Sequence, residues 1–244
     1  MGLHVNDLTG RKRILVIIPA YNEERSLPKV IAGIRKFPGI DIVVINDGSK
    51  DDTSAAARNA GVNVIDLPFN LGIGGAVQTG YLFAFKNGYD VAVQVDADGQ
   101  HNPGDLLKIT GPVIDGAADM VVGSRYIEST GYKTPLARKL GMLIFSAVVS
   151  FINGQPLHDT TSGYRAVSKR VIQFFVDNYP TDYPEVEALV LLKRNGFTIQ
   201  EVPVTMAHRV HGESSITPVK SVYYMIKVLL ALFMNLLRAA KKEA

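Results

Sequence analysis

Short apolar runs alternate with helical patterns along the first half of the chain. Five of the runs are rich in β-branched residues and end in Gly, Pro, Asn or Asp, which is typical of strands. We expect these strands at 13–20, 40–48, 62–67, 90–99 and 119–125. The patterns between them predict helices at about 24–37, 51–60, 74–87 and 103–115. This alternation predicts an α/β fold, with a mostly parallel central sheet and helices on both faces.

After residue 125 the pattern becomes mainly helical. It predicts a helix at 135–152, a polar bend in "GQPLHDTTSGYR", helices near 168–177 and 184–195, and a strand pair in "FTIQEVPV". We see no internal repeat or linker that would divide this part from the first half.

We therefore treat residues 1–215 as one domain. Its nucleotide-binding half spans about 13–125 and its acceptor half about 126–215, and residues 216–244 are expected to form a C-terminal amphipathic helix.

Polar clusters follow four of the predicted strands, namely "PAYNEE", "NDGS", "DADGQH" and "GSR". Asn, Asp and Gly commonly form turns, so each cluster has a simple explanation by itself. In open α/β sheets, however, ligands bind beyond the carboxyl ends of the strands. Four such clusters at one edge of the sheet predict a shared site.

Asp96 and Asp98 carry the clearest chemical signal in these clusters. Residues two apart point to the same face of a continuing strand, and a turn at Gly99 would still let both approach one cation. Two close carboxylates repel each other unless a divalent ion or a shared proton compensates, and oxygen ligands favour Mg²⁺ or Mn²⁺ bridged to phosphates. The alternative is a helix start capped by Asp98 or Asn102, which explains one carboxylate but not both.

Composition narrows the class of protein. The 244 residues are 47% hydrophobic and 20% charged, which excludes a disordered chain. The absence of cysteine excludes disulfides and thiolate metal sites and favours a reducing compartment. The first apolar stretch, Ile14 to Ile18, is too short for a signal peptide. The net charge of +3 reflects either an anionic partner or a surplus of surface lysine.

Six motifs occur in order along the chain: "PAYNEE", "NDGSKDDT", "DADGQH", "GSRY", "TSGYRA" and "RVHGES". Together they resemble family 2 glycosyltransferases of the GT-A fold, and most closely the polyprenyl-phosphate sugar transferases typified by dolichyl-phosphate mannose synthase. The resemblance covers about residues 14–215. It implies the nucleotide-diphospho-sugar transferase fold and a metal-dependent hexosyltransferase activity.

The resemblance also implies a nucleotide-sugar site. Its base and ribose would be lined by Pro19, Ala20, Tyr21 and Glu23, with Asp47 hydrogen-bonding the base. A carboxylate accepts a base N–H, and an aromatic ring beside it offers a stacking surface.

The donor phosphates and the metal occupy a neighbouring part of the implied site. The metal, Mg²⁺ or Mn²⁺, would be bound by Asp96, Asp98 and Gln100, and Asp96 would also face the donor phosphates. The residues expected to close over the diphosphate are Arg209, His211 and Ser214. We assign no catalytic role to His101, since a histidine on a loop is usually solvated.

The glycine-rich segment 70–80 resembles the family's N-x-G-K-G-x-A loop. Ile73 stands where many members have a cation, so close backbone packing is expected here instead of a direct phosphate contact. We place Gly74 in the nucleotide-sugar site on this basis.

The acceptor side depends on arginines and carboxylates. Arg125 and Arg138 match positions that meet the acceptor phosphate in the resembled subfamily, and each has a surface salt bridge as its alternative role. A phosphate acceptor needs no strong base, whereas a sugar hydroxyl does. The segment "TDYPEVEAL" supplies Asp182, Glu185 and Glu187, and Glu187 best matches a family glutamate. The candidate catalytic residues are Asp98, Arg209, Glu187 and Asp182.

The C-terminal segment 219–238 is apolar apart from a basic stripe. Lys220, Lys227 and Arg238 fall on nearly the same side of a helix, and the uncharged run between the last two is ten residues, too short to span a bilayer. This pattern is typical of a helix in an anionic membrane interface. The alternative is a helix packed on the body or on a second subunit.

The sequence as a whole predicts an inverting glycosyltransferase. It would move a sugar from a nucleotide-diphosphate sugar, a UDP-sugar in preference to GDP-mannose, to a polyprenyl phosphate. We expect a cytoplasmic protein, peripheral at the inner membrane face, with a small membrane protein or a second copy as further partners and no nucleic acid. The alternatives are transfer to a glycan hydroxyl and a non-catalytic nucleotide-sugar-binding subunit.

Overall fold

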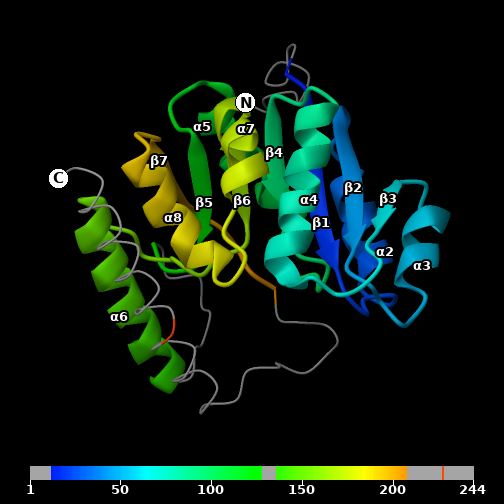
Figure 1. Ribbon diagram of the computed structural model, residues 1–244, viewed down its shortest axis with the longest axis horizontal. Helices are drawn as coiled ribbons and strands as arrows, with labels where there is room; N and C mark the ends of the chain where they lie inside the picture. The colour runs from blue at the N-terminus through cyan, green and yellow to red at the C-terminus, as the bar shows by residue number, and fades with distance from the viewer. Residues whose placement is uncertain (1–11, 128–135, 208–226, 228–244) are drawn as a thin grey trace.

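A seven-stranded sheet forms the centre of the protein, with helices on both of its faces (Figure 1). The structure is a computed structural model that describes residues 12–127, 136–207 and Lys227. The strands are β1 (Ile14–Ala20), β2 (Ile40–Asn46), β3 (Asn63–Asp66), β4 (Val91–Gln94), β5 (Met120–Ser124), β6 (Arg165–Ser168) and β7 (Ile199–Pro203). The helices are α2 (Leu27–Ile34), α3 (Thr53–Asn59), α4 (Gly72–Lys86), the 3₁₀ turn η1 (Pro103–Asp105), α5 (Leu106–Ile114), α6 (Leu136–Asn153), α7 (Lys169–Asn178) and α8 (Pro184–Arg194).

The strand order is β3-β2-β1-β4-β6-β5-β7. The pairs of β1 with β2 and β4, of β2 with β3, and of β5 with β7 are parallel, and β6 runs antiparallel to both β4 and β5. The predicted mostly parallel sheet is confirmed. Because β6 is antiparallel, its first residue lies at the edge where the parallel strands end.

The second half of the chain differs from the expectation in two places. Strand β6 was not predicted, because its four residues follow a polar bend and give no periodic pattern of their own. The expected strand pair in 197–204 is wrong: the segment forms the single strand β7, which pairs with β5. A parallel partner so far away in sequence leaves no local signal, since only hairpins bring paired strands together along the chain.

Both faces of the sheet are buried against helices. In β1, Leu15 and Ile17 face one core and Val16 and Ile18 face the other, and each of the four is fully buried. Helices α4, α7 and α8 contribute to the first core, and α2 and α5 to the second. Burying each such side chain stabilises the fold by about 1.5–3 kcal/mol, which explains why the strands read as continuous apolar runs.

Candidate active site

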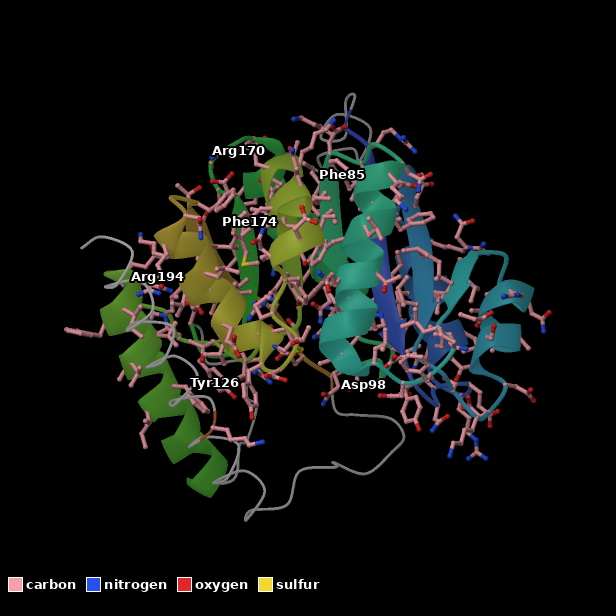
Figure 2. All side chains as sticks on the ribbon, viewed as in Figure 1. Phe85, Asp98, Tyr126, Arg170, Phe174 and Arg194 are labelled. Atoms are coloured by element: carbon pink, nitrogen blue, oxygen red, sulfur yellow. The ribbon has the colours of Figure 1, made fainter. Side chains whose placement is uncertain are left out.

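The predicted polar clusters meet at the carboxyl edge of the sheet. Figure 2 shows Asp98 and Tyr126 at this edge, with Phe85 and Arg170 at the opposite one. Two of the four clusters, those after β1 and β2, are joined by hydrogen bonds. The backbone N–H of Asn22 donates to Ser49 Oγ at 2.9 Å, and that of Glu23 donates to Thr53 Oγ1 at 2.8 Å.

A first pocket, the Asp47 pocket, has a volume of about 220 Å³. It is lined by Pro19, Ala20, Tyr21, Asp47, Asn70, Gly72, Ile73 and Ala76. Asp47 is buried, and its Oδ1 accepts the Leu71 N–H at 2.7 Å, which fixes the carboxylate against the glycine-rich loop. Tyr21 is 43% exposed, so its ring is available for stacking.

A second pocket, the acidic pocket, has a volume of about 230 Å³. It is lined by Pro19, Tyr21, Glu23, Ile73, Asp96, Ala97, Asp98 and Glu185. The two pockets share Pro19, Tyr21 and Ile73, so they are adjacent. A single ligand with a flat ring at one end and charged groups beyond it can therefore occupy both.

The acidic pair lies in a turn beyond the end of β4. The predicted strand 90–99 is longer than the observed one, since β4 ends at Gln94, and Gly99 in the following turn adopts a left-handed conformation with φ of +77°. Asp98 Oδ1 accepts the Gln100 N–H at 3.0 Å, which closes the turn. Gln100 lies in the same turn, but it is not among the residues that line the acidic pocket.

Asp96 and Asp98 fit a divalent cation that is shared with a phosphate ligand. Both carboxylates line one pocket, and Mg²⁺ or Mn²⁺ is commonly held by one or two carboxylates, with water and substrate phosphates as the other ligands. Within residues 12–127 and 136–207, no group of three or more His, Asp or Glu side chains is placed to hold an ion without such a ligand.

The carboxylate that α8 contributes to the acidic pocket is Glu185, not either of the two predicted residues. Asp182 is exposed before the helix, and Glu187 does not line the pocket. Residues two apart on a helix point about 200° from each other, so Glu185 and Glu187 cannot face the same pocket.

Arg165 is buried beside Glu185 at the first residue of β6. Its Nε donates to Ser162 O at 2.7 Å and its Nη2 to Glu185 O at 2.5 Å. Burial raises the pKa of the Glu185 carboxyl, the charge of Asp96 acts in the same direction, and Arg165 opposes the shift. Arg165 thus supports the pocket wall from inside and does not reach into it.

Arg125, a predicted ligand of the acceptor phosphate, makes a bidentate ion pair with Asp159. Its Nε and Nη2 donate to the two carboxylate oxygens at 2.7 and 2.6 Å, and Nη2 also donates to Thr161 Oγ1 at 3.0 Å. The Asp159 side chain is fully buried. Arg125 consequently has a structural role, whatever else it binds.

The remaining predicted residues lie on α6 or outside the described residues. Arg138 lies on α6, and Arg209, His211 and Ser214 lie outside the described residues, as do residues 216–244 apart from Lys227. The chain before Arg209 is attached to the acidic turn, because the Ala207 N–H donates to Gln100 O at 2.8 Å.

Gly74 lies where α4 meets the turn before α8. A Cβ at this position would come within 2.5 Å of Thr181 O and 2.8 Å of Thr181 Cα, so only glycine allows this approach. Gly74 does not line either pocket, and Ile73 lines both. Gly74 therefore packs closely against the backbone of Thr181, and its place in the nucleotide-sugar site stays a prediction.

No helix in the described part of the chain is long and apolar enough to cross a lipid bilayer.

The sheet order, with the paired carboxylates after β4, is that of the GT-A fold. A solved structure of glucosyl-3-phosphoglycerate synthase from Mycobacterium tuberculosis, in complex with Mn²⁺ and uridine-diphosphate-glucose, has the same fold. The comparison gives a TM-score of 0.69 and 19% sequence identity, and covers 96% of this chain and 83% of the other.

Residues 15–175 match the sequence profile of glycosyl transferase family 2, and the chain belongs to this family. It is 34% identical over 213 residues to the UDP-N-acetylglucosamine–dolichyl-phosphate N-acetylglucosaminyltransferase of Methanococcus voltae, with 79% of this chain and 85% of the relative covered. It is 32% identical over 218 residues to the polyprenol monophosphomannose synthase of Mycolicibacterium smegmatis, with 84% and 82% covered. The predicted family is therefore confirmed.

Proposed function

We propose that the protein transfers a sugar from a nucleotide-diphosphate sugar to a polyprenyl phosphate, with inversion at the anomeric carbon. A UDP-sugar is the favoured donor, and GDP-mannose is the alternative. The observation that carries this proposal is the adjacency of the two pockets. It allows a base to lie between Tyr21 and Asp47 while the diphosphate reaches Asp96 and Asp98.

The comparisons support the donor and the acceptor. The two curated relatives are named for transfer to dolichyl phosphate and for polyprenol monophosphomannose synthesis, and both align with most of this chain. The neighbouring structure with Mn²⁺ and uridine-diphosphate-glucose supports a divalent cation and a uridine donor.

The residues of the acidic pocket would bind the leaving group. A bound Mg²⁺ or Mn²⁺ would neutralise the negative charge that develops on the leaving diphosphate. Asp96 and Asp98 would hold this ion, and Glu23 and Tyr21 would position the ribose and base. Arg209, with His211 and Ser214 nearby in sequence, is proposed to close over the same phosphates.

The acceptor oxygen must attack in line behind the anomeric carbon. A phosphate oxygen is already anionic at neutral pH, so this reaction needs orientation and cations but no base. Arg125 and Arg138 are the proposed phosphate ligands. Arg125 binds Asp159 through Nε and Nη2, so it would contact the phosphate through Nη1, whereas Arg138 would bind it through two hydrogen bonds.

A second candidate function is transfer to a glycan hydroxyl. Glu185 favours it, because this carboxyl lines the pocket and its raised pKa suits a group that accepts a proton. In this reaction Glu185 would take the hydroxyl proton, a role that the sequence assigned to Glu187 or Asp182.

The proposal extends to the organisation of the chain. Residues 1–215 would form the catalytic domain, with the nucleotide bound mainly by residues 13–125 and the acceptor by residues 126–215. The C-terminal segment 216–244 would place the enzyme on the cytoplasmic face of the membrane, alone, with a second copy or beside a small membrane protein.

The decisive experiment incubates the full chain with a panel of UDP-sugars and GDP-mannose, with and without Mn²⁺. One series receives a short-chain polyprenyl phosphate and a parallel series receives soluble oligosaccharides. We expect a lipid-linked sugar with inverted anomeric configuration by NMR, formed only with the metal. A product on the oligosaccharide alone would replace this function with the second candidate.

A further inference from the structure

His101 lies under the acidic turn and is only 4% exposed. Its Nδ1 accepts a hydrogen bond from the backbone N–H of Asp96 at 3.0 Å. An imidazole nitrogen accepts only through its lone pair, so the ring proton is on Nε2. The ring therefore ties the first residue of the acidic turn to the last.

The His101 ring is held in place from both sides of the turn. It stacks on the Tyr164 ring, with centroids 4.7 Å apart and an interplanar angle of 9°. The Tyr164 hydroxyl donates to Asn102 O at 3.0 Å, and the backbone of His101 forms an antiparallel bridge with Met206. The imidazole consequently has one orientation, in which Nδ1 faces the Asp96 amide.

The Asp96 carboxylate is confined by the residues around the ring. Its Oδ1 lies 3.3 Å from the Gln94 amide nitrogen, which donates to it, and its Oδ2 lies 3.6 Å from His101 Nε2. A Cβ on Gly163 would lie 3.0 and 3.1 Å from these two oxygens, so no larger residue fits there without displacing them. The Gln94 hydrogen bond and the absence of a side chain at position 163 thus favour this position of the carboxylate on the pocket wall.

We propose that His101 is a positioning residue for the divalent-cation site. Its Nδ1 holds the Asp96 backbone so that the carboxylate faces the acidic pocket together with Asp98. This inference rests on the proposed function, because it assumes that Asp96 binds the ion. It assigns a role to a buried histidine that the sequence suggested to be a solvated loop residue.

Three substitutions separate the hydrogen bond from the packing of the ring. His101→Phe keeps an aromatic ring against Tyr164 but removes the acceptor. His101→Asn keeps an acceptor at the δ position without the ring, and His101→Gln moves the acceptor to the ε position. Second-sphere contacts of this kind typically change metal affinity about 10- to 100-fold.

The test is a titration of the full chain with Mn²⁺ in the presence of UDP. The unbound ion is measured at each step by electron paramagnetic resonance. We expect the Phe and Gln variants to bind Mn²⁺ at least about 10-fold more weakly than wild type, and the Asn variant to remain within about 3-fold. Thermal unfolding without metal, measured on the same samples, reports the structural cost of each change. If Phe does not fold, the comparison of Asn with Gln decides.

Two results would overturn the inference in different ways. Wild-type affinity in the Phe variant, or equal losses in Asn and Gln, would show that the Nδ1 contact does not position the site. A wild-type chain that binds no Mn²⁺ with UDP would remove the proposed metal-dependent function as well.

Discussion

The buried guanidinium of Arg165 donates to the backbone carbonyl of Glu185, and this contact joins the first residue of β6 to the first turn of α8. Through it, a charged side chain in the interior holds a carboxyl at the pocket wall. Burial of a carboxyl disfavours its charged form, so its pKa rises.

We predict that Glu185→Gln stabilises the fold at neutral pH. Burial raises the pKa of this carboxyl above its ordinary value of 4.5, so the folded state binds the proton more tightly than the unfolded chain. The contribution of the protonated carboxyl to the free energy of unfolding is complete below the pKa of the unfolded chain, and it is lost as pH rises through the pKa of the folded state. Urea unfolding should show a gain in the free energy of unfolding for the variant at about pH 7.5 that shrinks toward about pH 4. A gain that grows on acidification would contradict this assignment.

Asp98→Ala is expected to lower kcat at least about 100-fold and to remove the Mn²⁺-dependent part of UDP binding. The fold should persist, because Asp98 lies in a turn at the sheet edge and outside both apolar cores. Calorimetric titration with UDP, with and without Mn²⁺, measures the effect. The matched control is Asp115→Ala, an exposed aspartate at the end of α5. Metal-dependent binding that survives in the Asp98 variant would remove this residue from the site.

Gly163→Ala should weaken Mn²⁺ binding about 10-fold. The added methyl group would press on both oxygens of Asp96 and on Gln94 Nε2, each about 3.0–3.1 Å from the new Cβ. The control is Gly111→Ala in α5, where a Cβ meets no atom within 4 Å, and which should raise stability by about 0.5–1 kcal/mol. Paramagnetic titration measures the binding, and an unchanged affinity in the Gly163 variant would show that the Asp96 carboxylate can move at no cost.

Arg125→Ala is predicted to destabilise the fold by about 3–5 kcal/mol, because it leaves the Asp159 carboxylate buried without its partner. The double variant Arg125→Ala with Asp159→Asn should recover part of this loss. Chemical unfolding of the two variants and the wild type measures both effects. If the single variant keeps its stability and loses only activity on lipid phosphate, Arg125 serves the acceptor and the ion pair is dispensable.

The C-terminal segment should attach the enzyme to anionic membranes. We expect a chain that ends after Thr217 to bind nucleotide sugar but not to sediment with anionic liposomes, and to lose more activity on long polyprenyl phosphates than on short ones. Each of Lys220, Lys227 and Arg238 would contribute about 1 kcal/mol at such a surface, so their charge reversal should act like high salt. Full liposome binding by the truncated chain, or a change from dimer to monomer with unchanged lipid activity, would contradict this prediction.

The sequence alone determined the α/β fold, the family and the edge at which the site lies. Each depends on local information: apolar runs make buried strands, and polar residues at the ends of parallel strands must share an edge. Asp47, Tyr21 and Asp98 were predicted at that edge, and in the structure they line two adjacent pockets.

Only the tertiary structure decided which neighbouring residues reach the pocket and which support it. The choice of Glu185 over Glu187 depends on how α8 is rotated. The burial of His101 depends on Tyr164, which immediately precedes β6 and is about sixty residues away in the chain. Strand β6, which carries Arg165 into the interior, has antiparallel partners that are distant in the chain. These contacts join segments that are far apart in the chain, and no local sequence pattern indicates which segments will pair. They can therefore be identified only in the folded structure.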